Sequence, residues 1–406
     1  MPESIARLRA TVEHLAAIER PSASDGERRA AEWIRLRLEG STADARIEEE
    51  RAHGTYWIPL GLMTAAAGLA GLAAARGGRG PRALAAAVGA AAAAGVADDV
   101  SGGPHVFRRL LPHRTTYNVV AEAGDPAAER TIVFVAHHDA AHGGLVFAPQ
   151  LTTVPADAFP DWYERQQTSP QVMLLVAAGP ALVALGALTG LGPVRRLGTF
   201  VSLASAAAFA DIASRSVVPG ANDNLSGVAV VLELARALRE RPVQGVRVLL
   251  VSTGSEESFM EGMRGFARRH FPALPPERTE VVCLDSVGSP ELILIEGEGM
   301  LRMRDYTPEL RDRIAAVAGR AGVRLRRRLR LGLATDGLIA LKAGYPSAAI
   351  GSVTKYKLPL NYHSQRDTAD ALHYETVRDA AVLCEALVRE SAAPGSGTAA
   401  TPQPSP

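Results

Sequence analysis

Residues 131–139 have the sequence TIVFVAHHD, an apolar run rich in β-branched residues that ends in two histidines and an aspartate. An apolar run of such residues without polar alternation is typical of a strand buried on both faces of a sheet. Similar runs occupy residues 246–251, 280–284 and 292–295, and residues 227–239 have helical periodicity. Strands that alternate with helices predict an α/β fold with a central mixed, mostly parallel sheet covered on both faces.

Ionisable side chains follow the ends of these strands, where ligands bind in sheets of this kind. His137 and Asp139 follow the first strand, Glu256 and Glu257 follow the second, and Asp285 follows the third. A neutral imidazole can bind zinc while a carboxylate orients its other ring nitrogen. Two adjacent carboxylates repel each other unless a cation neutralises them. These side chains therefore predict a metal site at one edge of the sheet.

Two further loops can contribute to the same edge. Asp223 lies in the segment 219–227, PGANDNLSG, where it could bridge two cations or simply precede a capped helix. His363 lies in a late polar loop, directly after Tyr362. Each segment alone has an ordinary interpretation as a cap or a solvated loop. So many donors at one sheet edge favour a shared site.

The composition excludes some partners. The chain of 406 residues has 44 Lys and Arg against 43 Asp and Glu, so it has no basic field for nucleic acid. Its two cysteines, Cys283 and Cys384, are far apart, and we expect no disulfide. The first residues lack the apolar segment of a secretory signal peptide, so we expect membrane insertion to begin further along the chain.

Four runs without Asp, Glu, Lys or Arg interrupt this pattern, at 52–75, 83–97, 166–194 and 197–210. The first and third are long enough to cross a bilayer core of about 30 Å, and the other two are marginal alone. All four could instead be buried helices of a soluble protein. However, the segments around them must meet at one site, so each insert must return the chain to its starting side. This constraint favours two transmembrane hairpins.

The predicted organisation follows from these inserts. The metal-binding domain is discontinuous, at residues 1–55, 100–160 and 216–390, with transmembrane hairpins at 56–99 and 161–215 and a disordered tail at 391–406. Arginines lie at the hairpin tips, and by the positive-inside tendency they favour a multi-pass protein of the cell membrane with this domain outside the cytoplasm. These arginines are Arg76, Arg79, Arg82, Arg195 and Arg196.

The segments, in this order, resemble the co-catalytic zinc aminopeptidases of metallopeptidase clan MH, which include bacterial leucyl-type aminopeptidases and glutamate carboxypeptidase-like exopeptidases. The resemblance implies a three-layer zinc-exopeptidase fold that holds two zinc ions per chain. The implied metal ligands are His137, Asp223, Glu257, Asp285 and His363, with Asp223 bridging the ions. The implied catalytic residues are Glu256, as the general base, and Asp139, as support for His137. The implied substrate contacts are Asp336 and Tyr362.

The resemblance implies a peptide hydrolase that removes N-terminal residues by means of a water that two zinc ions activate. Peptides and the lipid bilayer are the expected partners. Two departures from the family pattern stand out: 83 residues, 140–222, follow Asp139 where the family has a short loop, and Gly337 stands where the family often has His. A single-zinc transferase resembling the glutaminyl cyclases, or a non-catalytic binding module resembling transferrin-receptor relatives, is an alternative. A transporter is disfavoured, because Asp211, directly after the fourth apolar run, is the single candidate for a charge inside the membrane.

Overall fold

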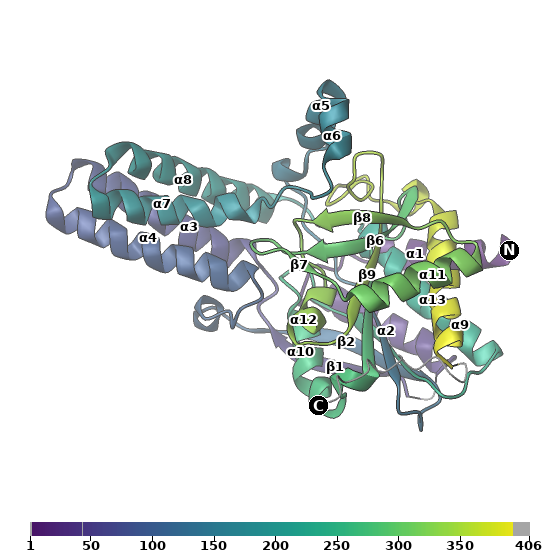
Figure 1. Cartoon of the computed structure of the whole chain (residues 1–406). Coiled ribbons are helices and arrows are strands. Elements are labelled where there is room, and N and C mark those ends of the chain that lie inside the picture. Colours follow the sequence, from purple (N-terminus) through teal and green to yellow (C-terminus); the bar gives the residue numbers. More distant parts are fainter. Residues whose placement is uncertain (1, 43, 393–406) are drawn as a thin grey trace, which may run out of the picture.

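The computed structural model describes residues 2–42 and 44–392, so the predicted disordered tail lies outside the described residues from position 393 onward. A nine-stranded sheet forms the centre, in the order β1-β2-β4-β3-β5-β9-β6-β7 with β8 beside β6 (Figure 1). β4, β3, β5 and β9 are parallel, whereas β1, β2 and β6 pair antiparallel with their neighbours β2, β4 and β9. The predicted α/β fold with a mixed, mostly parallel sheet is therefore confirmed. The strands are β1 (Arg46–Ala52), β2 (Arg114–Gly124), β3 (Thr131–His137), β4 (Arg247–Thr253), β5 (Thr279–Asp285), β6 (Glu291–Glu298), β7 (Arg304–Asp305), β8 (Arg326–Leu331) and β9 (Ser347–Val353).

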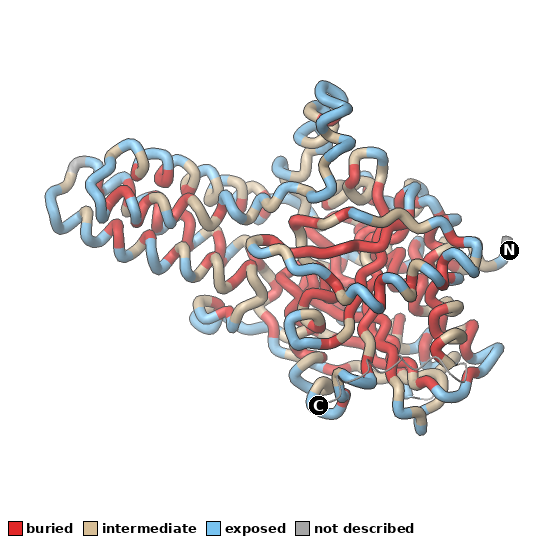
Figure 2. The backbone as a smooth tube through the Cα atoms, in the orientation of Figure 1, coloured by how far each residue is buried: buried red, intermediate tan, exposed pale blue. Residues whose placement is uncertain are grey.

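Helices cover both faces of the sheet, because successive strand side chains point to opposite sides. Ile132 and Phe134 of β3 belong to one buried cluster, and Val133 and Val135 belong to the other. Figure 2 shows the buried residues concentrated between these layers. The first face packs against α1 (Pro2–Ala16), α2 (Asp25–Glu39), α9 (Ser226–Glu240), α11 (Pro308–Ala321) and α13 (Tyr374–Ala392), and the second against α10 (Glu261–His270) and α12 (Gly337–Lys342).

The parallel strands bring their carboxyl ends to one edge of the sheet. β3 lies between β4 and β5, with His137 opposite Thr253 and Val135 opposite Cys283. The segments that follow these three strands are therefore neighbours in space although they are far apart in the sequence. Cys283 and Cys384 are buried free thiols, as the expected absence of a disulfide requires.

Four apolar helices form a bundle that projects from the α/β domain (Figure 1). They are α3 (Trp57–Arg76), α4 (Arg79–Val100), α7 (Met173–Thr189) and α8 (Gly192–Ser214). α3 packs against α4 and α8, and α7 packs against the same two helices. Three of the four are long and apolar enough to cross a membrane, by length and composition: Trp57–Ala75, Arg79–Val100 and Gly192–Ser214.

The fourth helix, α7, is shorter than the uncharged run at 166–194 predicted. The first residues of that run lie along β8 instead, where the amide of Ser169 donates to the carbonyl of Arg330. The run is preceded by the short helices α5 (Gln150–Ala158) and α6 (Pro160–Arg165), which form an exposed arm beside the bundle (Figures 1 and 2). Conversely, α4 and α8 continue past Asp98, Asp99 and Asp211, so the two runs that were marginal alone form the longer helices.

The domain end of the bundle is part of the domain's own core. Leu60 and Met63 of α3 and Val96 and Val100 of α4 belong to the same buried cluster as Val133 of β3. The first hairpin is thus packed on one face of the central sheet at its base and emerges from that face. Apolar burial of this kind contributes about 25 cal/mol per Å², so the hairpin and the domain stabilise each other.

Close helix contact in the bundle depends on glycine. A Cβ atom at Gly89 of α4 would lie 2.8 Å from the backbone of Ala184 and of Pro180 in α7. We predict that Gly89→Ala destabilises the protein by about 1–3 kcal/mol, the usual effect of overpacking. Gly80→Ala, in the same helix with no atom within 4 Å of the new Cβ, should be neutral. Thermal unfolding in detergent micelles measures both, and equal stabilities of the two variants would contradict the packing argument.

Candidate metal centre

Five ligand candidates converge from separate segments at the sheet edge. His137 and Asp285 are the last residues of β3 and β5, and Glu257 lies four residues after the end of β4. Asp223 lies in the irregular turn Ala221–Leu225 that leads into α9, and His363 lies in the loop after β9. His137, Asp223, Glu257 and His363 are buried. The structure thus brings the five candidate ligands together in a single cluster of nitrogen and oxygen donors.

The donors fall into two sets that share Asp223. Asp223 Oδ1 lies 3.2 Å from His137 Nε2, and the same nitrogen lies 4.0 Å from Asp285 Oδ2. The other oxygen, Asp223 Oδ2, lies 3.4 Å from His363 Nε2, which is 3.2 Å from Glu257 Oε2. In each set, and in a third made of His137, Glu256 and Glu257, the donor atoms lie within 4.8 Å of one another. One carboxylate therefore offers one oxygen to each of two adjacent positions.

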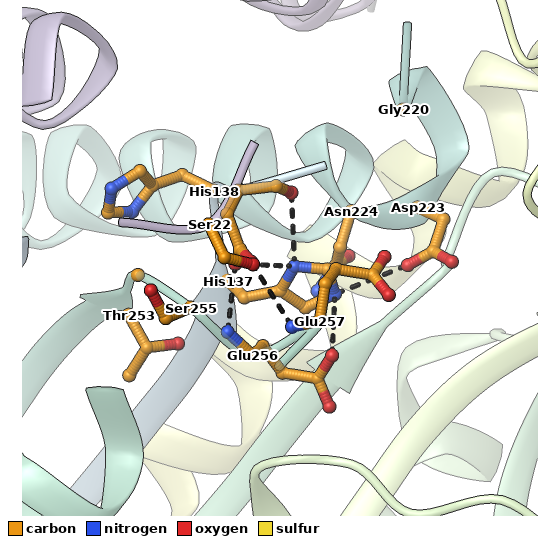
Figure 3. Close-up of polar contacts among 12 residues, drawn as sticks. Ser22, His137, His138, Gly220, Asp223, Asn224, Thr253, Ser255, Glu256 and Glu257 are labelled. Carbon is orange, nitrogen blue, oxygen red and sulfur yellow. Dashed lines mark hydrogen bonds and ion pairs between the residues drawn. The ribbon is translucent and has the colours of Figure 1, made fainter. Parts of the chain in front are cut away.

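Asp139 holds three parts of the centre in place. One of its oxygens lies 3.4 Å from His137 Nδ1, which leaves Nε2 of that ring facing Asp223. Its two oxygens also accept the backbone amides of Glu256 and Glu257, at 3.0 and 3.1 Å. The hydroxyl of Ser22 donates a further bond of 2.6 Å to this carboxylate. Figure 3 shows Ser22, His137 and the Glu256-Glu257 pair grouped around these contacts.

A second carboxylate, Asp367, performs the corresponding task for Asp223. Its oxygens accept the amides of Asn222 and Asp223, at 2.8 and 3.1 Å. Asn224 ties the same turn to the end of β5, because its side chain accepts the amide of Ser286 and donates to the carbonyl of Leu284. The backbone on both sides of Asp223 is therefore fixed by side-chain hydrogen bonds.

Two buried ionisable side chains, Arg20 and Glu27, support these loops. Arg20 donates to the carbonyls of His138, Pro219 and Gly220, each at 2.7 Å, so it links the loop after β3 to the turn that contains Asp223. Glu27 accepts the amide and hydroxyl of Ser255, just before the Glu256-Glu257 pair. Burial, together with the nearby Asp139 charge, raises the pKa of Glu27 to about 8.

Ionisation of three acids in the cluster is unfavourable because they are buried, as their raised pKa values indicate. Burial and the neighbouring Asp223 charge raise the pKa of Asp285 to about 7. Burial also raises the pKa of Glu256 and of Glu257. Asp223 goes the other way: burial opposes its ionisation, but its bonds to His137 and His363 lower its pKa. A cluster of buried acids in this state is stabilised by a cation.

The donors fit zinc in chemistry as well as in arrangement. Among the described residues, Glu257 Oε1 and His363 Nδ1 are buried atoms without a hydrogen-bond partner. Imidazole nitrogens mixed with carboxylate oxygens are ligands that zinc prefers in catalytic sites. The His137 ring is also oriented through its other nitrogen by a carboxylate, which is the usual arrangement around a metal-ligating histidine.

A cavity lies beside the cluster, and the four acids of the cluster and His363 line part of it. Its other walls are mostly apolar, and they comprise Ile293, Ile295, Leu331, Leu333, Ala334, Val353, Pro359 and Tyr362. Phe147, from the segment that leads into the second hairpin, packs edge-on against His363 with ring centroids 4.4 Å apart. The cavity therefore combines the ionisable side chains of the cluster with a largely apolar remainder of its lining.

The two predicted substrate contacts lie in different places. Tyr362 lines the cavity. Asp336 does not line it, and its carboxylate accepts the hydroxyl of Thr253 behind the centre. Gly337, the departure from the family pattern, has a structural explanation, because a Cβ there would lie 2.4 Å from the Tyr306 hydroxyl oxygen. Tyr306 fills the space that a larger side chain at 337 would need.

Several supporting residues were missed by the sequence analysis: Ser22, Arg20, Glu27, Asp367 and Phe147. Glu27 lies three residues after the helix cap Ser24, so its position is that of an ordinary capping glutamate. Instead its side chain reaches back to the amide of Ala23 and across to Ser255. Nothing in the sequence around Arg20 or Phe147 distinguishes them from surface residues.

Comparison with known proteins supports the resemblance. Residues 207–388 match peptidase family M28. The chain is similar in structure to the aminopeptidase from Aneurinibacillus sp. strain AM-1 (TM-score 0.53, 16% identity, covering 96% of this chain and 94% of that one). It is also similar to the glutaminyl cyclase of Fimbriiglobus ruber (TM-score 0.55, 16% identity, 96% of each chain). A leucine aminopeptidase precursor from Bacteroides thetaiotaomicron matches with a TM-score of 0.53, 12% identity and coverage of 95% of this chain and 97% of that one. No curated protein sequence matches the chain.

The electrostatics predict how the metal-free protein responds to pH. The raised pKa of Asp285 means that the folded state binds a proton that the unfolded state lacks between about pH 4 and pH 7, so stability falls as pH rises through that window. Contacts with Glu257 and Asp223 outweigh burial and raise the pKa of His363 to about 10, so its contribution is lost between about pH 6.5 and pH 10.

We therefore predict that the metal-free protein is less stable at pH 8 than at pH 5, by a difference on the order of 2 kcal/mol. Added zinc should remove most of this difference, because it replaces the protons. Thermal unfolding of chelator-treated protein, with and without zinc, measures both effects. A metal-free protein that is most stable at pH 8 would contradict the charge distribution described above.

Proposed function

With residues 207–388 matching peptidase family M28, we propose that the chain is a two-zinc aminopeptidase that hydrolyses N-terminal residues from peptides. One observation carries the proposal: Asp223 directs its two oxygens to two different donor sets, as a ligand shared by two ions must. The proposed ligands are His137, Asp223 and Asp285 for one ion, and Asp223, Glu257 and His363 for the other. The printed names of structural neighbours include aminopeptidases, which is consistent with this activity.

In the proposed mechanism, the zinc ions would polarise the scissile carbonyl and lower the pKa of a water molecule beside it. Glu256 has the role of general base. Glu256 Oε2 lies 3.8 Å from His137 Nε2, whereas Asp223 Oδ1 lies 3.2 Å from the same nitrogen. In this proposal the Glu256 carboxylate is therefore free to contact substrate and water. Burial raises its pKa, which favours proton uptake near neutral pH. Glu256 accepts the proton of the attacking water and transfers it to the leaving amine.

The remaining residues have positioning roles in this proposal. Asp139 orients His137 and fixes the Glu256 amide, so it sets the base relative to the metal ligands. Asp336 acts electrostatically, because its charge contributes to the raised pKa of Glu256. Tyr362 and the apolar wall would contact the substrate side chain.

We also propose that the helical bundle crosses the cell membrane as two hairpins, with the peptidase domain outside the cytoplasm. Length and composition support three of its helices as spans, and α7 is a shorter apolar partner packed between α4 and α8. The tips of both hairpins carry arginines, including Arg79 and Arg82, which favours a cytoplasmic position for the tips.

A glutaminyl cyclase with a single zinc is the second candidate, because such enzymes are among the structural neighbours. The two functions differ in the number of metal ions and in the reaction. Metal analysis of detergent-purified protein should give two zinc ions per chain, and His363→Ala should lower this number to about one. One zinc per wild-type chain, together with cyclisation of N-terminal glutamine, would favour the cyclase.

The general base provides the sharpest test of the hydrolase. We predict that Glu256→Gln retains zinc and the fold but lowers kcat by about 10²- to 10⁴-fold, the usual contribution of a general base. Hydrolysis of a panel of aminoacyl-anilides measures this. Glu233→Gln, at a carboxylate of α9 paired with Arg7, is the matched control and should keep full activity. Near-normal turnover by Glu256→Gln would contradict the assigned role.

A further inference from the structure

The segment that carries the Glu256-Glu257 pair has an unusual backbone. We call residues 254–260, between β4 and α10, the Glu-pair loop. Three of its non-glycine residues have positive φ: Ser255 at 49°, Phe259 at 68° and Met260 at 56°. L-residues rarely adopt this conformation, and it persists where the surroundings determine it. The contacts around the loop therefore decide where its two carboxylates lie.

A buried ionic cluster holds the far end of this loop. Arg108 is fully buried and donates to both oxygens of Asp99, at 2.6 and 3.1 Å. Its Nη1 donates to the carbonyl of Ser258 in the loop at 2.7 Å and lies 3.2 Å from Glu261 Oε1. A buried guanidinium with two carboxylate partners is positioned rigidly, since losing either partner leaves a charge uncompensated.

Both ends of the first hairpin meet at this cluster. Asp99 is in the last turn of α4, which returns from the bundle. Before α3, the amides of His53 and Gly54 both donate to Glu261 Oε2 at 2.9 Å. Tyr56, at the start of α3, stacks on Phe259 of the loop with ring centroids 5.1 Å apart, and lies edge-on to Phe209 of α8. The helical bundle thus contacts the Glu-pair loop through charges on one side and an aromatic stack on the other.

We propose that the ionic cluster of Asp99, Arg108 and Glu261, together with Tyr56, couples the helical bundle to the candidate catalytic centre. In this arrangement Arg108 is a positioning residue that sets Glu256 and Glu257 through the Ser258 carbonyl. The hairpin is then a working part of the centre as well as an anchor, and a change in bundle packing alters turnover. The inference rests on the proposed function of the Glu256-Glu257 pair.

The same junction contains a matched contact that does not reach the loop. Lys342 of α12 donates to the carbonyls of Ser101 and Gly102, both at 2.7 Å, directly after the end of α4. These hydrogen bonds tie the hairpin to the domain, and they involve no residue of the Glu-pair loop. A purely structural role of the ionic cluster predicts lower global stability without a response confined to the loop, whereas coupling predicts a response of the loop to loss of the Asp99 contact alone.

The test compares Asp99→Asn with Lys342→Met in the full chain, purified in detergent. We expect Asp99→Asn to speed hydrogen exchange in the Glu-pair loop by about 10-fold and to weaken zinc binding by about 10-fold, as loss of a supporting contact does. Its kcat should fall about 10-fold with KM changed less than about two-fold. Lys342→Met should leave loop exchange, zinc affinity and kcat within about two-fold of the wild type.

If Asp99→Asn does not fold, two substitutions of Tyr56, which leave the ionic cluster intact, test the same coupling. Tyr56→Phe keeps the ring on Phe259 and should behave as wild type, while Tyr56→Leu should show the same fast loop exchange and lowered kcat. Unchanged exchange in both Asp99→Asn and Tyr56→Leu, or equal effects from Lys342→Met, would overturn the coupling. Exchange and zinc affinity are independent of turnover. If the wild type hydrolyses no peptide while these two responses appear, the proposed function fails and the coupling stands.

Discussion

The crowding of like charges at one sheet edge is the constraint on which the rest of the structure depends. Parallel pairing of β3 with β4 and β5 brings three chain segments together, and each delivers a histidine or a carboxylate to the same small volume. Buried acids repel one another, so the arrangement favours a neutralising cation and needs rigid loops. Asp139 and Asp367 meet the second requirement, because each binds the backbone amides of the segment that carries a candidate ligand.

Much of this could be predicted from the sequence, and the reasons are physical. The strand ending at His137 and the acids after the following strands were visible because buried parallel strands are continuous apolar runs. The residues that support the ligand-bearing loops could not be recognised in the sequence. Arg20 acts through three backbone carbonyls that belong to distant segments, and Glu27 occupies an ordinary capping position while its side chain turns toward Ser255. Such contacts depend on tertiary packing, which local patterns do not encode.

The apolar inserts illustrate the same limit. The uncharged run at 166–194 predicted the longer helix, but part of it follows β8, since backbone groups there find partners in the sheet. The alanine-rich runs formed the longer helices because α4 and α8 extend beyond charged residues. Asp99 and Asp211 at these helix ends both have partners in the domain, Arg108 and the amide of Leu145. A charge that ends an apolar run in the sequence is here a contact between the bundle and the domain.

These two contacts connect each insert to a different part of the candidate centre. The first hairpin reaches the Glu-pair loop through Arg108, and the second reaches His363 through Phe147, whose segment is tied to Asp211 of α8 by the Leu145 amide. An insert that served only to anchor the domain could leave from any surface loop at little cost. Here both inserts emerge next to candidate ligands and contact the segments that hold them. The segments that carry candidate ligands are therefore in contact with both inserts, and the cavity beside them is lined by apolar residues of β6 and β8 and by Tyr362.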